Sequence, residues 1–249
     1  MNLRHHEAFT RGELLAVLAA IAILGVLAVP VLANNRERSA RLLCLNNLRQ
    51  IGQAFERFGT EHGTRLPWRT PWCEGGTMPG QVTDCVGSPP VWMSGALYNN
   101  AWFQFSWMSN EVRSPKVLAC PSDIQKRPAS NWGMTPDGFL HASLRDAALS
   151  YFVGLDVFTA DRAGLVSGDR NVLFNFAGGA CSSGVTYNSS LNSPGSTGIG
   201  GGLHVEAGNF LFGDGSVEQL SSQGFVARVS AMLGAQDNGS AHYLRPNSP

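Results

Sequence analysis

One acidic residue stands out by its position, because Glu13 directly precedes residues 14–33, none of which carries a charged side chain. A carboxylate can stabilise the N-terminus of a helix through the helix dipole. In hydrocarbon, the same group is costly unless it finds a cationic partner. We therefore consider two roles for Glu13, a local one at the start of a helix and an ion pair with a neighbouring chain.

Three further residues have side chains of the types that can act as metal ligands. His204 and Glu206 would point to the same side of a strand because they are two residues apart, and Asp214 follows eight residues later. We favour a hydrogen-bonded histidine beside a hairpin over a metal site at these positions. The sequence therefore predicts no metal and no cofactor.

The five cysteines are scattered, and no two of them form a Cys-x-x-Cys pair, which argues against a zinc knuckle or a thioredoxin-like site. In a domain outside the cytoplasm, cysteines like these form disulfides. We favour a bridge between Cys73 and Cys85, which lie twelve residues apart in a stretch rich in glycine and proline. A second candidate joins Cys44 to Cys120. The sequence alone leaves other connectivities open.

The sequence contains none of the Gly-x-Ser-x-Gly, His-Glu-x-x-His and P-loop patterns, so we predict that the chain is not an enzyme. Six tryptophans raise the question of sugar stacking, but core packing and loop anchoring are their ordinary roles. The formal net charge is zero and only 14% of residues are charged. A nucleic-acid surface is therefore not expected.

Residues 14–33 are long and apolar enough to cross a membrane as a helix. Twenty helical residues span about 30 Å, which matches the hydrocarbon core of a bilayer. Their twelve Leu, Ile and Val side chains contribute about −4 to −7 kcal/mol toward insertion. Three interpretations stay open: a cleaved secretory signal, an uncleaved anchor, or a segment that uses Glu13. The run is longer than the apolar core of most signal peptides.

The helical pattern continues after the apolar run. In residues 34–62, apolar side chains recur at steps of three and four residues, with charged residues between them. One helix of about fifty residues accounts for both halves, with a kink at Pro30. Another element must cover its apolar stripe, which consists of Leu45, Leu48, Ile51, Phe55 and Phe58.

These residues resemble the N-terminal region of type IV pilins and type II secretion pseudopilins. Phe9-Thr10, followed by Glu13 and the apolar run, is similar to their processing motif, and residues 44–52 are similar to the continuation of their helix. Two short stretches are typical of a planctomycete and verrucomicrobial pilin-like group. They are Cys-Pro-Ser-Asp at residues 120–123, and His204 followed after nine residues by Asp214-Gly215.

The resemblance implies that a prepilin peptidase/methyltransferase cuts between Ala8 and Phe9 and methylates the new N-terminus, so that residues 1–8 form a leader peptide. Residues 9–33 then form the transmembrane half of the helix. The cationic amino group of Phe9 in one subunit pairs with Glu13 of a neighbour and fixes the register of a filament.

The resemblance also bears on the location of the protein and on whether it holds calcium. The resemblance implies a single-pass protein of the inner membrane, with a cytoplasmic N-terminus and a periplasmic or extracellular C-terminal domain. Some pseudopilins hold calcium in a C-terminal loop, but here Asp214 and Asp237 are isolated acids.

Residues 63–249 predict a loop-rich β domain, with strands at residues 102–108, 150–155, 165–168 and 171–176. Asp214-Gly215 predicts a type I′ hairpin, followed by an amphipathic helix capped by Ser221 or Ser222. The expected fold class is α+β and pilin-like. A long N-terminal helix, transmembrane and then amphipathic, packs on a mostly antiparallel sheet with large irregular loops.

The sequence thus predicts a pilin-like subunit of a type IV pilus or a type II secretion-type filament. The expected partners are copies of the chain or other pilin-like subunits, the prepilin peptidase/methyltransferase and membrane lipid. The alternative is a membrane-anchored, monomeric, extracytoplasmic binding module whose site is formed by the tryptophan-rich loops.

Overall fold

The computed structural model describes part of the 249-residue chain, and its contacts divide the chain into two compact units, Met1–Ala40 and Arg41–Pro249. The described residues are 10–78, 85, 87, 90, 97–157, 164–173, 186–190, 198–201, 203, 204, 207–234 and 240–246. Within them, the side chains of residues 27–37, 173, 186–190, 234 and 240 are not described.

The first element is α1 (Arg11–Glu61), which begins with a capping box. The backbone N–H of Thr10 donates to Oε2 of Glu13 at 2.8 Å, and the backbone N–H of Glu13 donates to Oγ1 of Thr10 at 3.3 Å. These bonds satisfy N–H groups that have no partner inside the helix. The local role considered for Glu13 is therefore present in the structure.

The large apolar side chains at positions 14–26 of α1 are half or more exposed. Among the described residues, no helix combines the length and the apolar character needed to cross a membrane. The predicted run at residues 14–33 is described only in part. Pro30, the predicted kink, lies outside the described side chains, and Ala8 and Phe9 lie outside the described chain.

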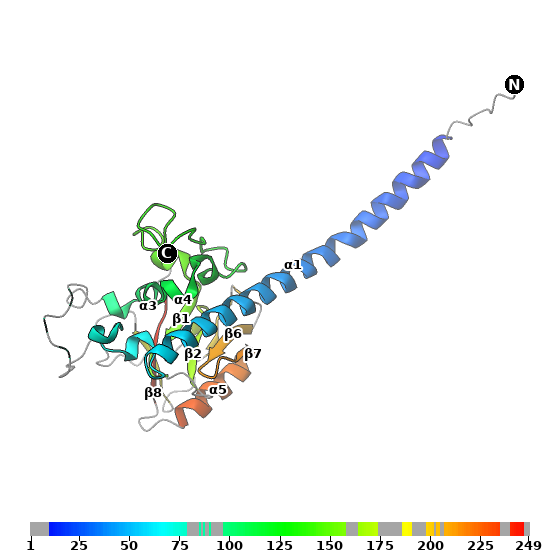
Figure 1. The fold of residues 1–249 in the computed structure, drawn as a ribbon. Coiled ribbons are helices and arrows are strands. Elements are labelled where there is room, and N and C mark those ends of the chain that lie inside the picture. The colour runs from blue at the N-terminus through cyan, green and yellow to red at the C-terminus, as the bar shows by residue number, and fades with distance from the viewer. Residues whose placement is uncertain are drawn as a thin grey trace. The chain divides into compact units, whose positions relative to one another are not determined.

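The second unit is built on a sheet of six strands in the order β4-β8-β1-β2-β6-β7. Figure 1 labels β1, β2, β6, β7 and β8 of this sheet. Every neighbouring pair in this sheet is antiparallel, in agreement with the α+β prediction. The strands are β1 (Tyr151–Gly154), β2 (Leu165–Asp169), β4 (Thr186–Ser190), β6 (Ala207–Phe212), β7 (Val217–Ser221) and β8 (Ser240–Leu244). A separate two-stranded sheet pairs β3 (Val172–Leu173) with β5 (Gly198–Ile199).

Helices supply the rest of the regular structure in the second unit, which includes residues 41–61 of α1. The α-helices are α3 (Ala101–Trp107), α4 (Ser109–Val112) and α5 (Ser222–Gly234). Short 3-10 helices lie within the loops: η1 (Pro67–Arg69), η2 (Trp72–Glu74), η3 (Leu97–Asn99), η4 (Pro115–Leu118) and η5 (Arg145–Ala148).

Both faces of the sheet are buried at the central strands β1, β2 and β6. Successive residues of a strand point to opposite faces. Val153 of β1 packs in a cluster with α1, whereas its neighbour Phe152 packs in a cluster with α5. On β6, Leu211 joins the α1 cluster and Phe210 joins the α5 cluster. Burial on both sides explains why these strands are continuous apolar runs rather than alternating ones.

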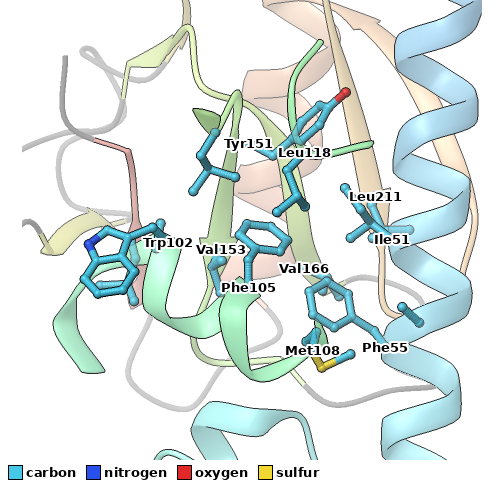
Figure 2. Packing of buried hydrophobic residues seen from close by; sticks show 14 of the residues in the cluster. Ile51, Phe55, Trp102, Phe105, Met108, Leu118, Tyr151, Val153, Val166 and Leu211 are labelled. Atoms are coloured by element: carbon cyan, nitrogen blue, oxygen red, sulfur yellow. The ribbon is translucent and has the colours of Figure 1, made fainter. Parts of the chain in front are cut away.

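Four of the five residues of the predicted apolar stripe of α1 are buried beside this sheet, whereas Leu45 is only half-buried. Leu48, Ile51, Phe55 and Phe58 are at most 3% exposed. Figure 2 shows Ile51 close to Leu211 of β6. The approach is close because a Cβ atom at Gly52 would lie 2.7 Å from Cδ1 of Leu211. A glycine inside a helix lowers its stability, and here the contact with β6 explains it.

The C-terminal helix α5 also forms where the sequence predicts it. Oγ of Ser221 accepts the backbone N–H of Gly224 at 3.3 Å, so Ser221 is the N-cap. Phe225 stacks on Phe210 with ring centroids 4.4 Å apart. The other side chains of the buried face are Val229, Met232 and Leu233.

The strand predictions have mixed outcomes. β1 and β2 coincide with the strands expected at residues 150–155 and 165–168, and the expected strand at 171–176 is described only as β3. The prediction of a strand at residues 102–108 is wrong, because these residues belong mainly to α3. Five of the seven residues of α3 are buried, so the helix has no polar face to reveal its period.

The Asp-Gly hairpin joins β6 to β7, but the predicted type I′ turn is wrong. A type I′ turn needs a positive φ at both central residues. Here φ is +80° at Gly215 and is not positive at Asp214. The N–H of Gly215 donates to the carbonyl of Phe212 at 3.0 Å, and the N–H of Phe212 donates to the carbonyl of Ser216 at 2.9 Å. The connection is therefore a three-residue loop with glycine in the left-handed position.

A carboxylate beside β8 makes stability depend on pH. Oδ2 of Asp156 lies 2.7 Å from Nδ1 of His242 and 2.6 Å from its backbone nitrogen, and Arg69 contacts the same carboxylate at 3.5 Å. The hydrogen bond to Asp156 raises the pKa of His242 above 6.5, against the opposing effects of burial and of Arg69. The folded state thus binds this proton more tightly than the unfolded state. The resulting stability is complete below the unfolded pKa and is lost as the pH rises through the folded pKa.

We expect Asp156→Asn to lower the free energy of unfolding more at about pH 6 than at about pH 8, since histidine titrates in this interval. The amide can still accept the backbone N–H of His242 but carries no charge. Urea unfolding of both proteins at a series of pH values measures the difference. A difference that stays constant across this range would contradict the assignment.

Candidate functional site

The two short motifs of the sequence meet inside the second unit. Cys120 opens the Cys-Pro-Ser-Asp stretch, and its Sγ atom lies 3.7 Å from Nε2 of His204, the first residue of the other motif. Both residues are buried, at 2% exposure each. Cys120 follows η4, and His204 precedes β6. Tertiary folding therefore joins two segments that are 84 residues apart in the sequence.

A disulfide between Cys44 and Cys120 ties this point to α1. The two cysteines are 76 residues apart in sequence, and their Cα atoms lie 5.1 Å apart. Closing a loop of this length stabilises the fold by roughly 4 kcal/mol in the chain-entropy account. The second disulfide joins Cys73 to Cys85. These are the two pairings that the sequence analysis considers; Cys181 lies outside the described residues.

The last residue of the Cys-Pro-Ser-Asp stretch, Asp123, holds a buried ion pair. Arg170 follows β2 and donates to both carboxylate oxygens of Asp123, at 2.7 and 2.9 Å. Oγ of Ser150 donates to the same carboxylate at 3.0 Å and accepts the backbone N–H of Cys120 at 3.0 Å. The Asp123 side chain is 1% exposed and that of Arg170 is 13% exposed. The stretch is thus fastened at one end by a disulfide and at the other by a bidentate ion pair.

A second buried acid, Asp169 at the end of β2, lies beside His204. Its Oδ2 atom is 3.5 Å from Nε2 of His204 and accepts the backbone N–H and the side-chain N–H of Asn209, at 2.7 and 3.0 Å. Burial raises the pKa of Asp169 to about 7, although the two bonds from Asn209 oppose the shift. Burial and the Asp169 charge also raise the pKa of Tyr151, the residue paired with Asp169 across β1 and β2.

The structure does not bring together the metal ligands considered from the sequence. Asp214 lies exposed in the β6–β7 loop, where it accepts bonds from the backbone N–H and the hydroxyl of Ser216, at 3.0 and 2.6 Å. His204 precedes the other end of β6, and the six residues of that strand extend about 17 Å. Glu206 lies outside the described residues. Of the two described residues of this set, His204 faces Cys120 and Asp169.

The tryptophans mostly serve as core and loop anchors. Trp68 and Trp102 are buried in the cluster that contains α1. Nε1 of Trp107 donates to the carbonyl of Gly75 at 2.6 Å, and Nε1 of Trp132 donates to that of Arg113 at 3.0 Å. Trp72 is half-buried, and Trp92 lies outside the described residues.

The chemistry of this site comes from a disulfide, an imidazole and two carboxylates in a closed interior. A cleft of about 390 Å³ borders it, since Asp123, Arg170 and Leu203 line that cleft. Sequence reasoning missed the pairing of His204 with Cys120 and Asp169, because no local spacing encodes a contact between segments so far apart. No family model matches the chain, and no curated protein or solved structure matches it either.

The Asp123–Arg170 pair gives a stability test with an internal control. We expect Asp123→Ala to lower the free energy of unfolding by about 3 kcal/mol or more, because it leaves a largely buried guanidinium without its carboxylate. The control is Glu74→Ala, which removes the partner of Arg65 from a pair whose side chains are 45% and 35% exposed. There we expect less than about 1 kcal/mol. Urea unfolding of the three proteins measures both losses, and equal losses would show that Asp123 is no anchor.

Proposed function

We propose that this chain is a pilin-like, pseudopilin-type subunit of a type IV pilus or a type II secretion-type filament. The observation that carries the proposal is the division of α1. Its first turns expose large apolar side chains, whereas the stripe within residues 41–61 is buried by an antiparallel sheet. An exposed apolar helix that continues into a packed domain fits a subunit that sits in a membrane before assembly and against other helices afterwards.

In this proposal, residues 14–33 cross the inner membrane, within a transmembrane half at residues 9–33, and the domain after them is exported. The composition of the run supports insertion by the transfer energies given above. The two disulfides support an exported domain, because disulfides persist in oxidising compartments and are rare in the cytosol.

Processing between Ala8 and Phe9 supplies the charge that Glu13 needs. The new α-amino group of Phe9 has an ordinary pKa of about 7.7 to 8.0 and is cationic at neutral pH. In a neighbouring subunit, Glu13 then pairs with this ammonium inside the apolar interior of the filament. An unpaired charge would be costly there, so the pair fixes the stagger between helices.

The capping box and the intermolecular pair do not exclude each other. Thr10 donates both its backbone N–H and its hydroxyl to the same oxygen of Glu13, Oε2, at 2.8 and 2.9 Å. An ionised carboxylate accepts about four hydrogen bonds over its two oxygens. Oε1 can therefore receive the amino group of a neighbour while the helix start stays intact.

Two substitutions separate the local role of Glu13 from the intermolecular one. Glu13→Gln keeps the capping box, because glutamine serves at this position as glutamate does, but it removes the charge. Thr10→Ala weakens the cap by about 1 kcal/mol and keeps the charge. We expect Glu13→Gln to reduce filament formation at least about tenfold, which corresponds to a loss of about 1.4 kcal/mol in the free energy of association. We expect Thr10→Ala to leave filament formation close to wild type.

Filaments from cells are counted by electron microscopy and quantified by sedimentation, with the amount of membrane-bound subunit as the control for expression. Mass spectrometry of the mature N-terminus accompanies this assay and should find N-methylated Phe9. Normal filaments from Glu13→Gln would remove the ion pair from the proposal. Mature chains that retain Met1 would remove the pilin-like function itself.

A further inference from the structure

We propose that Cys44, Cys120 and His204 form a zinc site when the disulfide between the two cysteines is reduced. This inference does not depend on the filament function, because it rests only on residues of the second unit. One ligand comes from α1, one from the segment after η4 and one from the segment before β6. The site would replace the covalent tether between α1 and the Cys-Pro-Ser-Asp stretch by a metal tether.

The ligand atoms already lie close to one another. The two Sγ atoms and a ring nitrogen of His204 are all within 4.8 Å of one another, and all three residues are buried. In a tetrahedral zinc site, bonds of about 2.3 Å to sulfur and 2.0–2.1 Å to nitrogen place neighbouring ligand atoms about 3.5 Å apart. The observed 3.7 Å between Sγ of Cys120 and Nε2 of His204 matches this spacing.

Little movement is needed at the sulfurs. Once the bond between them is cleaved, Cys44 and Cys120 need only separate from bonding distance to about 3.8 Å, the sulfur–sulfur spacing of a tetrahedral zinc site. The backbone of Cys44 is held by a helix, and that of Cys120 by the ion pair and hydrogen bonds around Ser150 and Asp123. The carbonyl of His204 accepts the backbone N–H of Ala207 at 3.4 Å. The site is therefore pre-organised.

The chemistry of the donors selects the metal. Two thiolates and one imidazole suit zinc, whereas calcium and magnesium require oxygen ligands. Thiolates in a buried site are costly without a counter-charge, and a dication supplies it. The carboxyl group of Asp169 lies next to the site, with Oδ2 at 3.5 Å from Nε2 of His204.

Zinc can bind only after the disulfide has been reduced, and it then replaces the two thiol protons. A phosphine reductant and one water convert the disulfide to two thiols and a phosphine oxide. Zinc then bonds to the two sulfurs, and two protons pass to the buffer. The cleft lined by Asp123 and Leu203 lies beside the segment that carries His204, since Leu203 directly precedes it. A small-molecule disulfide added as oxidant restores the protein disulfide by exchange, leaves as two thiols after taking up two protons, and releases the ion, so that metal and disulfide exclude each other.

The test uses the full chain in detergent, oxidised or reduced with a phosphine, and incubated with zinc chloride before gel filtration. We expect one more zinc ion per chain in the reduced protein than in the oxidised protein, measured by elemental analysis. The double variant Cys73→Ser/Cys85→Ser should take up the same extra ion, because its sulfurs are not part of the cluster. Cys44→Ser/Cys120→Ser should take up none.

His204→Gln tests the nitrogen ligand. It should weaken zinc binding more than about 100-fold in competition with a chromophoric chelator, since even residues outside the ligand set change metal affinity 10–100-fold. Cobalt in place of zinc should give a thiolate charge-transfer band in wild type and in the Cys73→Ser/Cys85→Ser variant.

Near-ultraviolet circular dichroism follows the fold in every sample. If reduction alone loosens the structure, zinc should restore the native spectrum. A reduced chain that binds no more zinc than the oxidised chain would overturn the proposal. So would a His204→Gln variant that binds zinc as tightly as wild type, or a loosened chain that zinc does not restore.

Discussion

The packing of the second part of α1 on the sheet is the constraint on which the rest of this structure depends. The stripe from Leu48 to Phe58 is covered by the apolar face of the sheet together with α3 and η1, whose Phe105 and Trp68 contact Phe55. Fully burying a large apolar side chain is worth about 1.5–3 kcal/mol. Because the strands are apolar on their second face as well, α5 becomes necessary on that side. The layered α+β architecture follows from the packing of α1 on one face of the sheet and of α5 on the other.

Periodic features could be predicted from the sequence. The stripe of α1, the Ser221 cap, the buried strands β1 and β2 and the Asp-Gly hairpin all have local signals. The errors arise where the local signal is ambiguous. α3 is surrounded by the core, so its aromatic residues show no period that distinguishes a helix from a strand. The exact loop at Gly215 depends on the register between β6 and β7, which the dipeptide alone does not specify.

The candidate site could be predicted only in pieces. Cysteine spacing and loop composition suggested the Cys73–Cys85 bridge, Cys44–Cys120 was a second candidate, and the motifs singled out Asp123 and His204. Their assembly could not be read from the sequence, because the partners of His204 come from β2 and from the segment after η4. His204 and Asp214 are close in sequence, but the strand β6 between them moves apart residues that lie only ten positions from each other.

The described loops around this site depend on polar contacts more than on regular structure. Arg170 and Ser150 fasten Asp123, while Asn209 holds Asp169. Groups of this kind are stable in the interior only as long as their hydrogen bonds are satisfied. The buried polar network therefore fixes one arrangement of the segment that carries Cys120, and with it the position at which α1 is tethered.

The two disulfides are nested, because the Cys73–Cys85 bridge lies inside the loop closed by Cys44 and Cys120. A growing chain presents Cys44 first and Cys73 second, before either has its native partner. Oxidation in order of appearance would join these two and leave Cys85 to Cys120, and both bridges would be non-native. Maturation therefore requires either that Cys44 wait as a thiol until residue 120 has been made, or that thiol–disulfide exchange reshuffle an early mistake. The order of the cysteines thus makes late docking of the helix, rather than the first encounter of two thiols, the event that secures the correct covalent structure.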